Sequence, residues 1–312
     1  MKNLWKIFLL VIAFVLPCTQ AASQVQFGVP KKMSNSILRI SSFYDYYPLG
    51  STASGRYEGL LDTFLKDFQT FANFSAEMYR GQDYEETIRT GAKGRSDIIL
   101  GMYSDTSIYG DLKFIYPAAI DNPVHLVMLP SKISAVKKIS DLRNMKGAID
   151  SREYWSDFVK DQMQNFNLEK IDNSYDLYGK LLRGEIDYIF TTYWFGSIEM
   201  MKLGVRDLVT LSKKSIWSMP VFIGISKISM ERDYLSHNLT QWLSRQEVRD
   251  KIKNRAIEIL QKVEEETRGT VPPSYILEQP KEEAKTPVEE KNNPLLSSSP
   301  LLGGPLLNNT NN

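Results

Sequence analysis

Hydrophobic residues along the middle of the chain follow two different spacings. Leucine and phenylalanine recur every three or four residues over 60–71, which predicts an amphipathic helix. Shorter apolar runs at 98–102 and 221–226 predict buried strands. Segments of the two kinds alternate over residues 37–263, and this alternation is typical of an α/β fold.

One turn motif occurs twice. In each copy a helix-ending glycine precedes an aspartate by three residues, and a short apolar strand follows: Gly94 with Asp97, and Gly184 with Asp187. A helical segment comes before each copy. We assign the glycines and aspartates mainly to turn geometry. Any α/β protein can contain one such turn, but two copies separated by enough chain for a lobe predict two similar lobes.

These patterns divide the chain into segments. Lobe 1 is predicted at 37–126 and lobe 2 at 127–218, with apolar strands at 124–129 and 221–226 crossing between them. Residues 219–268 are predicted to form the return strand and two helices that pack on lobe 1. Residues 269–312 change to a low-complexity composition, which predicts a disordered tail. Its three Leu-Leu pairs are read as sequence drift, with a partner-binding segment as the alternative.

The first 22 residues have the pattern of a cleaved signal peptide. Lys2 and Lys6 precede an apolar run at 7–16, which is shorter than the ~20 residues that a membrane span needs, and small residues follow it. Residues 23–36 are predicted to be a polar lead-in. An uncleaved anchor is the alternative. Cys18 is the one cysteine, so cleavage would leave no disulfide, thiol nucleophile or cysteine metal ligand.

Composition and motifs narrow the function classes. The chain has 312 residues, 42% of them hydrophobic, and a formal net charge of +1, which suits a globular protein and indicates no nucleic-acid partner. Nucleophile elbows, zinc spacings and phosphate loops do not occur in it. His125 and His237 are predicted on a strand and a helix, where histidines are more often structural than catalytic. We therefore expect no enzyme activity, no metal and no cofactor.

Short motifs occur in a fixed order between residues 37 and 263: Tyr47-Pro48, Gly59, Gly94 with Asp97, Gly101-Met102, Thr106, Asp141-Leu142 with Lys146-Gly147, Gly184 with Asp187, and Gly224. In this order, and with its export signal, the chain resembles the extracellular solute-binding proteins of family 3, the periplasmic receptors of polar amino-acid uptake systems. The resemblance implies a type II periplasmic-binding-protein fold, with two α/β lobes that close on a small ligand. It also implies a periplasmic monomer whose partner is an inner-membrane permease.

The chain departs from that family where the ligand would bind. In the family's amino-acid binders, an arginine three residues after the tip threonine fixes the ligand carboxylate; here Thr106 is followed by Tyr109. Uncharged residues 191–193 replace the usual aspartate, and residues 150–152 replace a Gly-Ser or Gly-Thr tip. The resemblance therefore implies a ligand other than a standard α-amino acid.

Ligands of open α/β sheets bind beyond the carboxyl ends of the strands. The predicted ligand-binding residues are accordingly the strand tips: Tyr44, Tyr47, Tyr103, Ser104, Asp105, Thr106, Ser151, Arg152, Tyr154, Trp155, Thr191, Thr192 and Tyr193. Their aromatic rings and hydroxyls suit a small polar or aromatic ligand. Other readings remain open: tyrosines that pack the lobe interface, Arg152 paired with Asp150 or Glu153, and Asp105 in a turn.

The sequence thus predicts a periplasmic solute-binding protein that captures such a ligand for an ABC-type uptake system. Two alternatives remain. One is an exported sensory or interaction module on the same fold, and the other is a lyase that uses Asp105.

Overall fold

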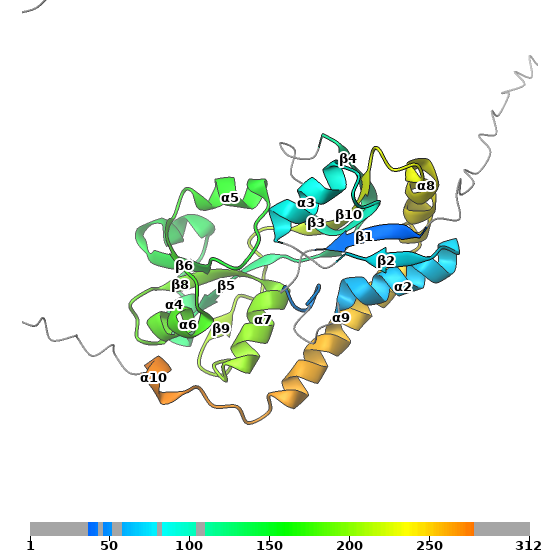
Figure 1. Cartoon of the computed structure of the whole chain (residues 1–312). Helices are drawn as coiled ribbons and strands as arrows, with labels where there is room; N and C mark the ends of the chain where they lie inside the picture. The colour runs from blue at the N-terminus through cyan, green and yellow to red at the C-terminus, as the bar shows by residue number, and fades with distance from the viewer. Residues whose placement is uncertain (1–36, 43–45, 52–57, 80–82, 104–109, 278–312) are drawn as a thin grey trace, which may run out of the picture. The chain divides into compact units, whose positions relative to one another are not determined.

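The computed structural model describes residues 37–42, 46–51, 58–79, 83–103 and 110–277. The predicted signal peptide, the lead-in and the tail from residue 278 lie outside these ranges, as do Tyr44, Ser104, Asp105 and Thr106. The described chain has two five-stranded sheets flanked by helices, which confirms the two-lobed α/β prediction (Figure 1).

The first sheet belongs to lobe 1 and has the strand order β2-β1-β3-β10-β4. Its strands are β1 (Leu38–Ser42), β2 (Ala76–Met78), β3 (Ile98–Tyr103), β4 (Leu112–Asp121) and β10 (Pro220–Ser226). Strand β1 pairs in parallel with β2 and β3, whereas β10 runs antiparallel between β3 and β4.

Four helices cover this sheet: α2 (Leu60–Ala72), α3 (Tyr84–Ala92), α8 (Arg232–Leu243) and α9 (Gln246–Glu266). Successive side chains of β3 point to opposite faces, as the period of a strand requires. Ile98 and Leu100 join the core that includes the apolar side of α2, while Ile99 packs with Ile88 of α3. Helices α2 and α3 therefore cover opposite faces.

The second sheet belongs to lobe 2 and has the order β7-β6-β8-β5-β9. Its strands are β5 (Val124–Met128), β6 (Lys146–Asp150), β7 (Asn167–Ile171), β8 (Tyr188–Thr192) and β9 (Thr210–Leu211). The helices of lobe 2 are α4 (Pro130–Ile133), the 3-10 helix η2 (Ile139–Asn144), α5 (Asp157–Met163), α6 (Ser174–Leu182) and α7 (Tyr193–Lys202). Strand β6 is parallel to β7 and β8, and β5 is antiparallel to β8.

The chain crosses between the sheets at positions that differ from the prediction. The apolar runs at 124–128 and 220–226 each lie inside one sheet, so neither is itself a crossing. The crossings are short segments beside these strands. Asn122 N–H donates to the Met219 carbonyl at 3.0 Å, and Val124 N–H donates to the Trp217 carbonyl at 2.8 Å. Apolar runs mark burial within a sheet, whereas the crossing itself is short and partly polar.

The twin glycine–aspartate turns occupy equivalent places in the two lobes. Gly94 and Gly184 have φ angles of 67° and 74°, in the left-handed region that glycine adopts without a Cβ clash. Strand β3 of the first sheet follows one turn and β8 of the second sheet follows the other. The repeat in the sequence is therefore a repeat in the fold.

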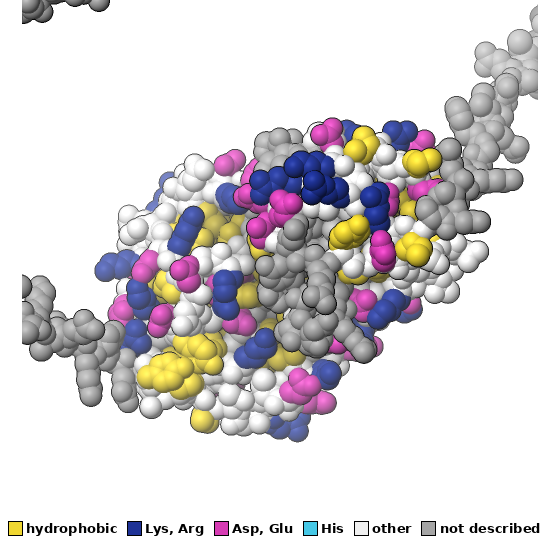
Figure 2. All heavy atoms as spheres, in the orientation of Figure 1, with side chains coloured by type: hydrophobic (Ala, Val, Ile, Leu, Met, Phe, Trp, Pro, Cys, Tyr) yellow, Lys and Arg dark blue, Asp and Glu magenta, His cyan; other side chains and the backbone are white. Residues whose placement is uncertain are grey.

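The C-terminal part of the chain corrects a second prediction. The composition predicts that residues 269–277 belong to the disordered tail, but they continue from α9 and end in α10 (Ser274–Leu277), which packs on α6. Ile276 is 1% exposed, and Arg183 Nη1 donates to its carbonyl at 2.9 Å. The sequence does not predict this contact, because the adjacent Pro-Pro pair is typical of a disordered segment and Ile276 is a single buried apolar residue. Hydrophobic side chains gather around α6 and α10 in Figure 2, where Tyr175 and Tyr275 are both exposed.

Candidate functional site

A buried polar cluster lies where strand ends of both sheets meet. Tyr103 ends β3, Thr191 and Thr192 end β8, and Glu153 follows three residues after β6. Strands β6 and β8 are parallel neighbours, so their carboxyl ends lie at the same edge of the sheet. Tyr46 reaches the cluster from a loop of lobe 1.

Glu153 is the centre of this cluster. Its side chain is 5% exposed. Thr192 N–H donates to Oε2 at 2.8 Å, and the Thr191 hydroxyl lies 2.6 Å from Oε1. Burial raises the pKa of Glu153 to about 8, so the carboxyl is mainly protonated at neutral pH. The sequence suggests Glu153 only as a partner for Arg152, although Glu153 lies among the predicted strand-tip residues 151–155, and that position is the feature that could have identified it as a site residue.

Tyrosines complete the cluster from lobe 1. The hydroxyl of Tyr46 lies 2.9 Å from Thr192 Oγ1, and Asn122 Nδ2 donates to the hydroxyls of Tyr46 and Tyr103, each at 3.4 Å. Burial raises the pKa of both tyrosines. The Tyr46 ring stacks on Phe195 of lobe 2 at 5.6 Å. Hydrogen bonds and ring contacts thus join the lobes at this point.

A cavity of about 280 Å³ adjoins Glu153. Tyr84 and Ile88 of α3 line it from lobe 1, and Glu153, Tyr154 and Trp155 line it from lobe 2. The Trp155 side chain is 8% exposed, and its indole N–H has no hydrogen-bond partner among the described residues. A buried donor without a partner costs about 1–3 kcal/mol, so a ligand that accepts from it would recover that free energy.

The structure places several predicted site residues at this cluster or its cavity: Tyr103, Ser151, Tyr154, Trp155, Thr191 and Thr192. Ser151 lies at the cavity wall, and its hydroxyl donates to Asp172. These positions come from both lobes, as the strand-tip argument predicts.

Arg152 is held by carboxylates of its own lobe. Its Nη2 lies 2.6 Å from Asp150 Oδ2 and 3.2 Å from Glu199 Oε2, and it also bonds to Ser174. Asp150 is fully buried, so this arginine neutralises it. The reading in which Arg152 pairs with Asp150 is therefore the one that the structure shows.

Tyr47 and Tyr193 lie apart from the cluster. Tyr47 packs beside α7 and α9, where Lys202 Nζ is 5.7 Å from its ring centroid. The Tyr193 ring lies 5.5 Å from that of His125, and it lines a different cavity. The four remaining predictions (Tyr44, Ser104, Asp105 and Thr106) fall outside the described residues.

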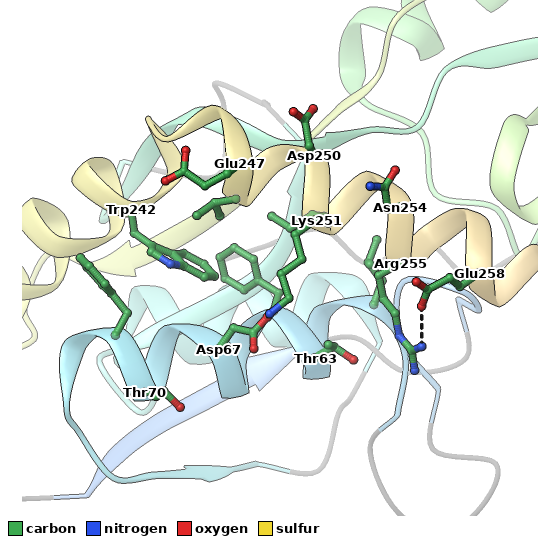
Figure 3. A pocket seen from close by; sticks show the side chains of 15 residues that line it. Thr63, Asp67, Thr70, Trp242, Glu247, Asp250, Lys251, Asn254, Arg255 and Glu258 are labelled. Atoms are coloured by element: carbon green, nitrogen blue, oxygen red, sulfur yellow. Dashed lines mark hydrogen bonds and ion pairs between the residues drawn. The ribbon is translucent and has the colours of Figure 1, made fainter.

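A separate groove lies between α2 and α9, with Trp242 at its base (Figure 3). Charged side chains at this groove pair with one another: Lys251 with Asp67 at 2.7 Å, and Arg255 with Glu258 at 2.9 Å. It does not include the strand ends, so we do not assign the ligand site to it.

Three further properties of the described residues bear on function. In the part of the chain that the structure describes, no group of three or more His, Cys, Asp and Glu side chains is arranged to hold a metal ion. None of the helices within the described ranges has the length and apolar character needed to cross a membrane. Acidic and basic side chains are interspersed on the face seen in Figure 2.

Comparisons with known proteins identify the fold. No protein-family model and no curated protein sequence matches the chain. Among solved structures, the GluR0 ligand-binding core in complex with L-glutamate has a TM-score of 0.57 and 11% identity, covering 71% of this chain and 98% of that one. The VFT2 domain of Bordetella pertussis BvgS has a TM-score of 0.55 and 14% identity, covering 72% and 92% of the two chains.

The amino acid ABC transporter substrate-binding protein AbpA of Streptococcus pneumoniae, bound to L-arginine, has a TM-score of 0.53 and 14% identity, covering 72% of this chain and 95% of that one. At these identities the likeness establishes the fold, and the coverage shows that it extends over both lobes. The chain therefore has the two-lobed fold shared by ABC-transporter solute-binding proteins and Venus flytrap domains, at low sequence identity to each.

Proposed function

We propose that the protein captures a small polar or aromatic ligand between its lobes and delivers it to the inner-membrane permease of an ABC-type uptake system. The main observation in support of this proposal is the cavity beside Glu153. Both lobes line it, and one of its lining residues is Trp155, whose buried indole N–H has no hydrogen-bond partner among the described residues. Solute-binding proteins of ABC transporters are among the structures that share this fold, which supports transport as the use of the site.

The cavity walls define the ligand class. Tyr84, Tyr154 and Trp155 provide aromatic surfaces, and the Trp155 N–H calls for an acceptor oxygen or nitrogen. Arg152 is committed to Asp150, and Glu153 is mainly protonated at neutral pH. Neither is therefore a charged clamp for an α-amino acid. The charged residues that line the cavity are Glu85, Lys160 and Lys170, of which Lys160 pairs with Asp157 and Glu85 with Arg89. A flat ligand with a hydrogen-bond acceptor fits these walls better.

Trp155→Phe tests this assignment because it removes the indole N–H and keeps an aromatic ring. A thermal-shift screen of amines, sugars, small acids and nucleobases should yield compounds that raise the Tm of the natural protein, since they bind only its folded state. Trp155→Phe should reduce that rise. The matched control Tyr175→Phe also removes one polar atom from an aromatic side chain, but at an exposed position of α6 that does not line the cavity. A complete screen without any shift would contradict the proposal, as would an equal shift in Trp155→Phe.

A sensory or interaction module is the second candidate, and one observation favours it. The polar cluster already joins the lobes through the protein's own side chains, with Tyr46 hydrogen-bonded to Thr192. A sensor domain of a histidine kinase has the same fold, with a TM-score of 0.53 and 14% identity. Affinity capture from membranes distinguishes the two: recovery of a sensor without a permease supports this candidate. The lyase alternative depended on Asp105, which lies outside the described residues.

A further inference from the structure

A second cavity, of about 740 Å³, lies against the crossing connections between the lobes. It is lined by β4 and α9 of lobe 1 and by β5 and α7 of lobe 2, and it shares no lining residue with the cavity beside Glu153. Trp194 Nε1 donates to the Asp121 carbonyl at 2.9 Å, which ties the start of α7 to the end of β4 at the cavity wall. A molecule in this space would contact both lobes at once.

His125 supplies a hydrogen-bond acceptor to this cavity. Its side chain is 7% exposed, and Nδ1 lies 2.8 Å from the Ser212 carbonyl, which can only accept. Nδ1 therefore carries the proton. Burial lowers the pKa of His125, so the ring is neutral at physiological pH and Nε2 is an acceptor. Nε2 has no hydrogen bond to any described residue, and the Tyr193 ring lies beside the imidazole.

The charged side chains that line this cavity differ in whether they already have hydrogen-bond partners within the protein. Asp121 accepts from Ser218 Oγ and from Met219 N–H, both at 3.0 Å. Asp250 accepts from Gln246 at 2.9 Å, and Arg249 donates to the Leu243 carbonyl at 2.6 Å. Lys253 is the charged lining residue for which the described part of the chain provides no polar partner. Among the described residues, the ammonium group of Lys253 is therefore available to pair with an anionic ligand.

We propose that this hinge cavity is a second small-molecule site, which binds a planar aromatic carboxylate. The Tyr193 ring and the aliphatic side chains of Ile120 and Ile257 enclose the ligand ring. A hydroxyl on that ring donates to His125 Nε2, and the carboxylate pairs with Lys253. Because the walls come from both lobes, an occupied site resists changes in the angle between them. This site is independent of the ligand proposed for the cavity beside Glu153.

Calorimetric titration with 4-hydroxybenzoate and with benzoate tests the proposal. The natural protein should bind both, with 4-hydroxybenzoate favoured because only it can donate to Nε2. His125→Phe should remove that preference, and Lys253→Gln should weaken both compounds roughly tenfold or more, the effect of losing a charged hydrogen bond. Lys262→Gln, near the other end of α9, is the matched control and should bind like the natural protein.

Four results would overturn the proposal, and the first three concern the cavity's own residues. These three are absence of binding at millimolar concentration, a preference that persists in His125→Phe, and unchanged affinity in Lys253→Gln. Loss of binding in Trp155→Phe would show that the probe binds in the cavity beside Glu153, and would therefore also reject the hinge site. Lys253 is exposed, so its variant keeps the test decisive even if His125→Phe does not fold. A negative outcome here leaves the thermal-shift test of the first cavity unaffected.

Discussion

The backbone N–H of Thr192 donates a 2.8 Å hydrogen bond to the buried carboxyl of Glu153. No Lys, Arg or His is paired with this carboxyl among the described residues. Desolvation therefore dominates its titration and raises the pKa to about 8. The end of β8 and the tip after β6 are held together by a neutral network at physiological pH.

This network predicts a specific pH dependence of stability. Below about pH 4.5, the ordinary pKa of the carboxyl, Glu153 is protonated in both the folded and the unfolded chain. Between about 4.5 and about 8 the unfolded chain ionises while the folded one keeps its proton. The contribution of this group to the free energy of unfolding therefore falls as pH rises through that window, by at most ~1.4 kcal/mol per pH unit. Above it the contribution is constant.

Glu153→Gln isolates the effect, because glutamine keeps the shape of the protonated acid and one donor. Urea unfolding at pH 5 and pH 8 should show the variant gaining stability over the natural protein as the pH rises. Glu169→Gln, a partly exposed position on β7, is the control and should not change the slope. An equal pH dependence in Glu153→Gln and the natural protein would show that Glu153 keeps its charge in the folded state.

The two turn aspartates fasten neighbouring strands in the same way. Asp97 Oδ2 accepts from Arg39 N–H of β1, and Asp187 Oδ2 accepts from Lys146 N–H of β6, both at 2.9 Å. Partial burial raises the pKa of Asp187, but the hydrogen bonds from Lys132 and Lys146 lower it more, and the net pKa lies below its usual value. These aspartates bind the start of the adjacent parallel strand in addition to shaping the turn.

Asp97→Asn and Asp187→Asn should each lower the free energy of unfolding by about 1–3 kcal/mol, because a charged acceptor is lost. The two sites lie in different sheets, so the double variant should show the sum. Asp161→Asn on exposed α5 should change stability by less than ~0.5 kcal/mol. Denaturant midpoints measure all four, and a loss no greater than that of Asp161→Asn would assign the aspartates to turn geometry alone.

Sequence periodicity was enough to predict the lobes, because apolar spacing reports directly on buried faces such as those of α2 and β3. It missed β7, an edge strand whose side chains are mostly exposed and therefore lack an apolar pattern. It also missed Glu153 as a site residue, since a glutamate is ordinarily solvent-exposed and only tertiary contacts bury this one. Sequence spacing also gave no sign that Tyr193 lies apart from the other strand-tip residues, with its ring beside that of His125 at the start of α7.

A close approach between β6 and β8 makes Gly147 sensitive to substitution. A Cβ at this position would lie 2.3 Å from the Tyr188 ring and 2.6 Å from the Leu168 side chain. Both neighbours belong to paired strands, and Tyr188 is fully buried. Gly147→Ala should therefore cost about 1–3 kcal/mol of stability through overpacking. Gly110→Ala meets no atom within 4 Å and should be close to neutral by thermal unfolding. Equal Tm values for Gly147→Ala and Gly110→Ala would show that the neighbouring strands shift to accommodate the added methyl group.

The segment after α9 forms a third connection between the lobes. Helix α9 contacts α2 of lobe 1 and α7 of lobe 2, Arg206 of lobe 2 pairs with Glu264 at 2.5 Å, and the chain then reaches α6 (Figure 1). Ile276 enters the core of lobe 2 at that point, beside Leu177 and Tyr178. A change in the angle between the lobes would therefore strain or release this anchor.

Ile276→Ala should release it. Truncating a buried isoleucine costs about 2–5 kcal/mol, and because α10 ends the described chain the loss should appear as local detachment before global unfolding. Hydrogen exchange should rise in α6 and α10 while the first sheet stays protected. Leu277→Ala, the exposed neighbour, is the control and should leave exchange unchanged. Faster exchange in both sheets of Ile276→Ala would instead show that the segment after α9 unfolds together with the rest of the protein. Unchanged exchange would show that Ile276 does not hold this segment against lobe 2.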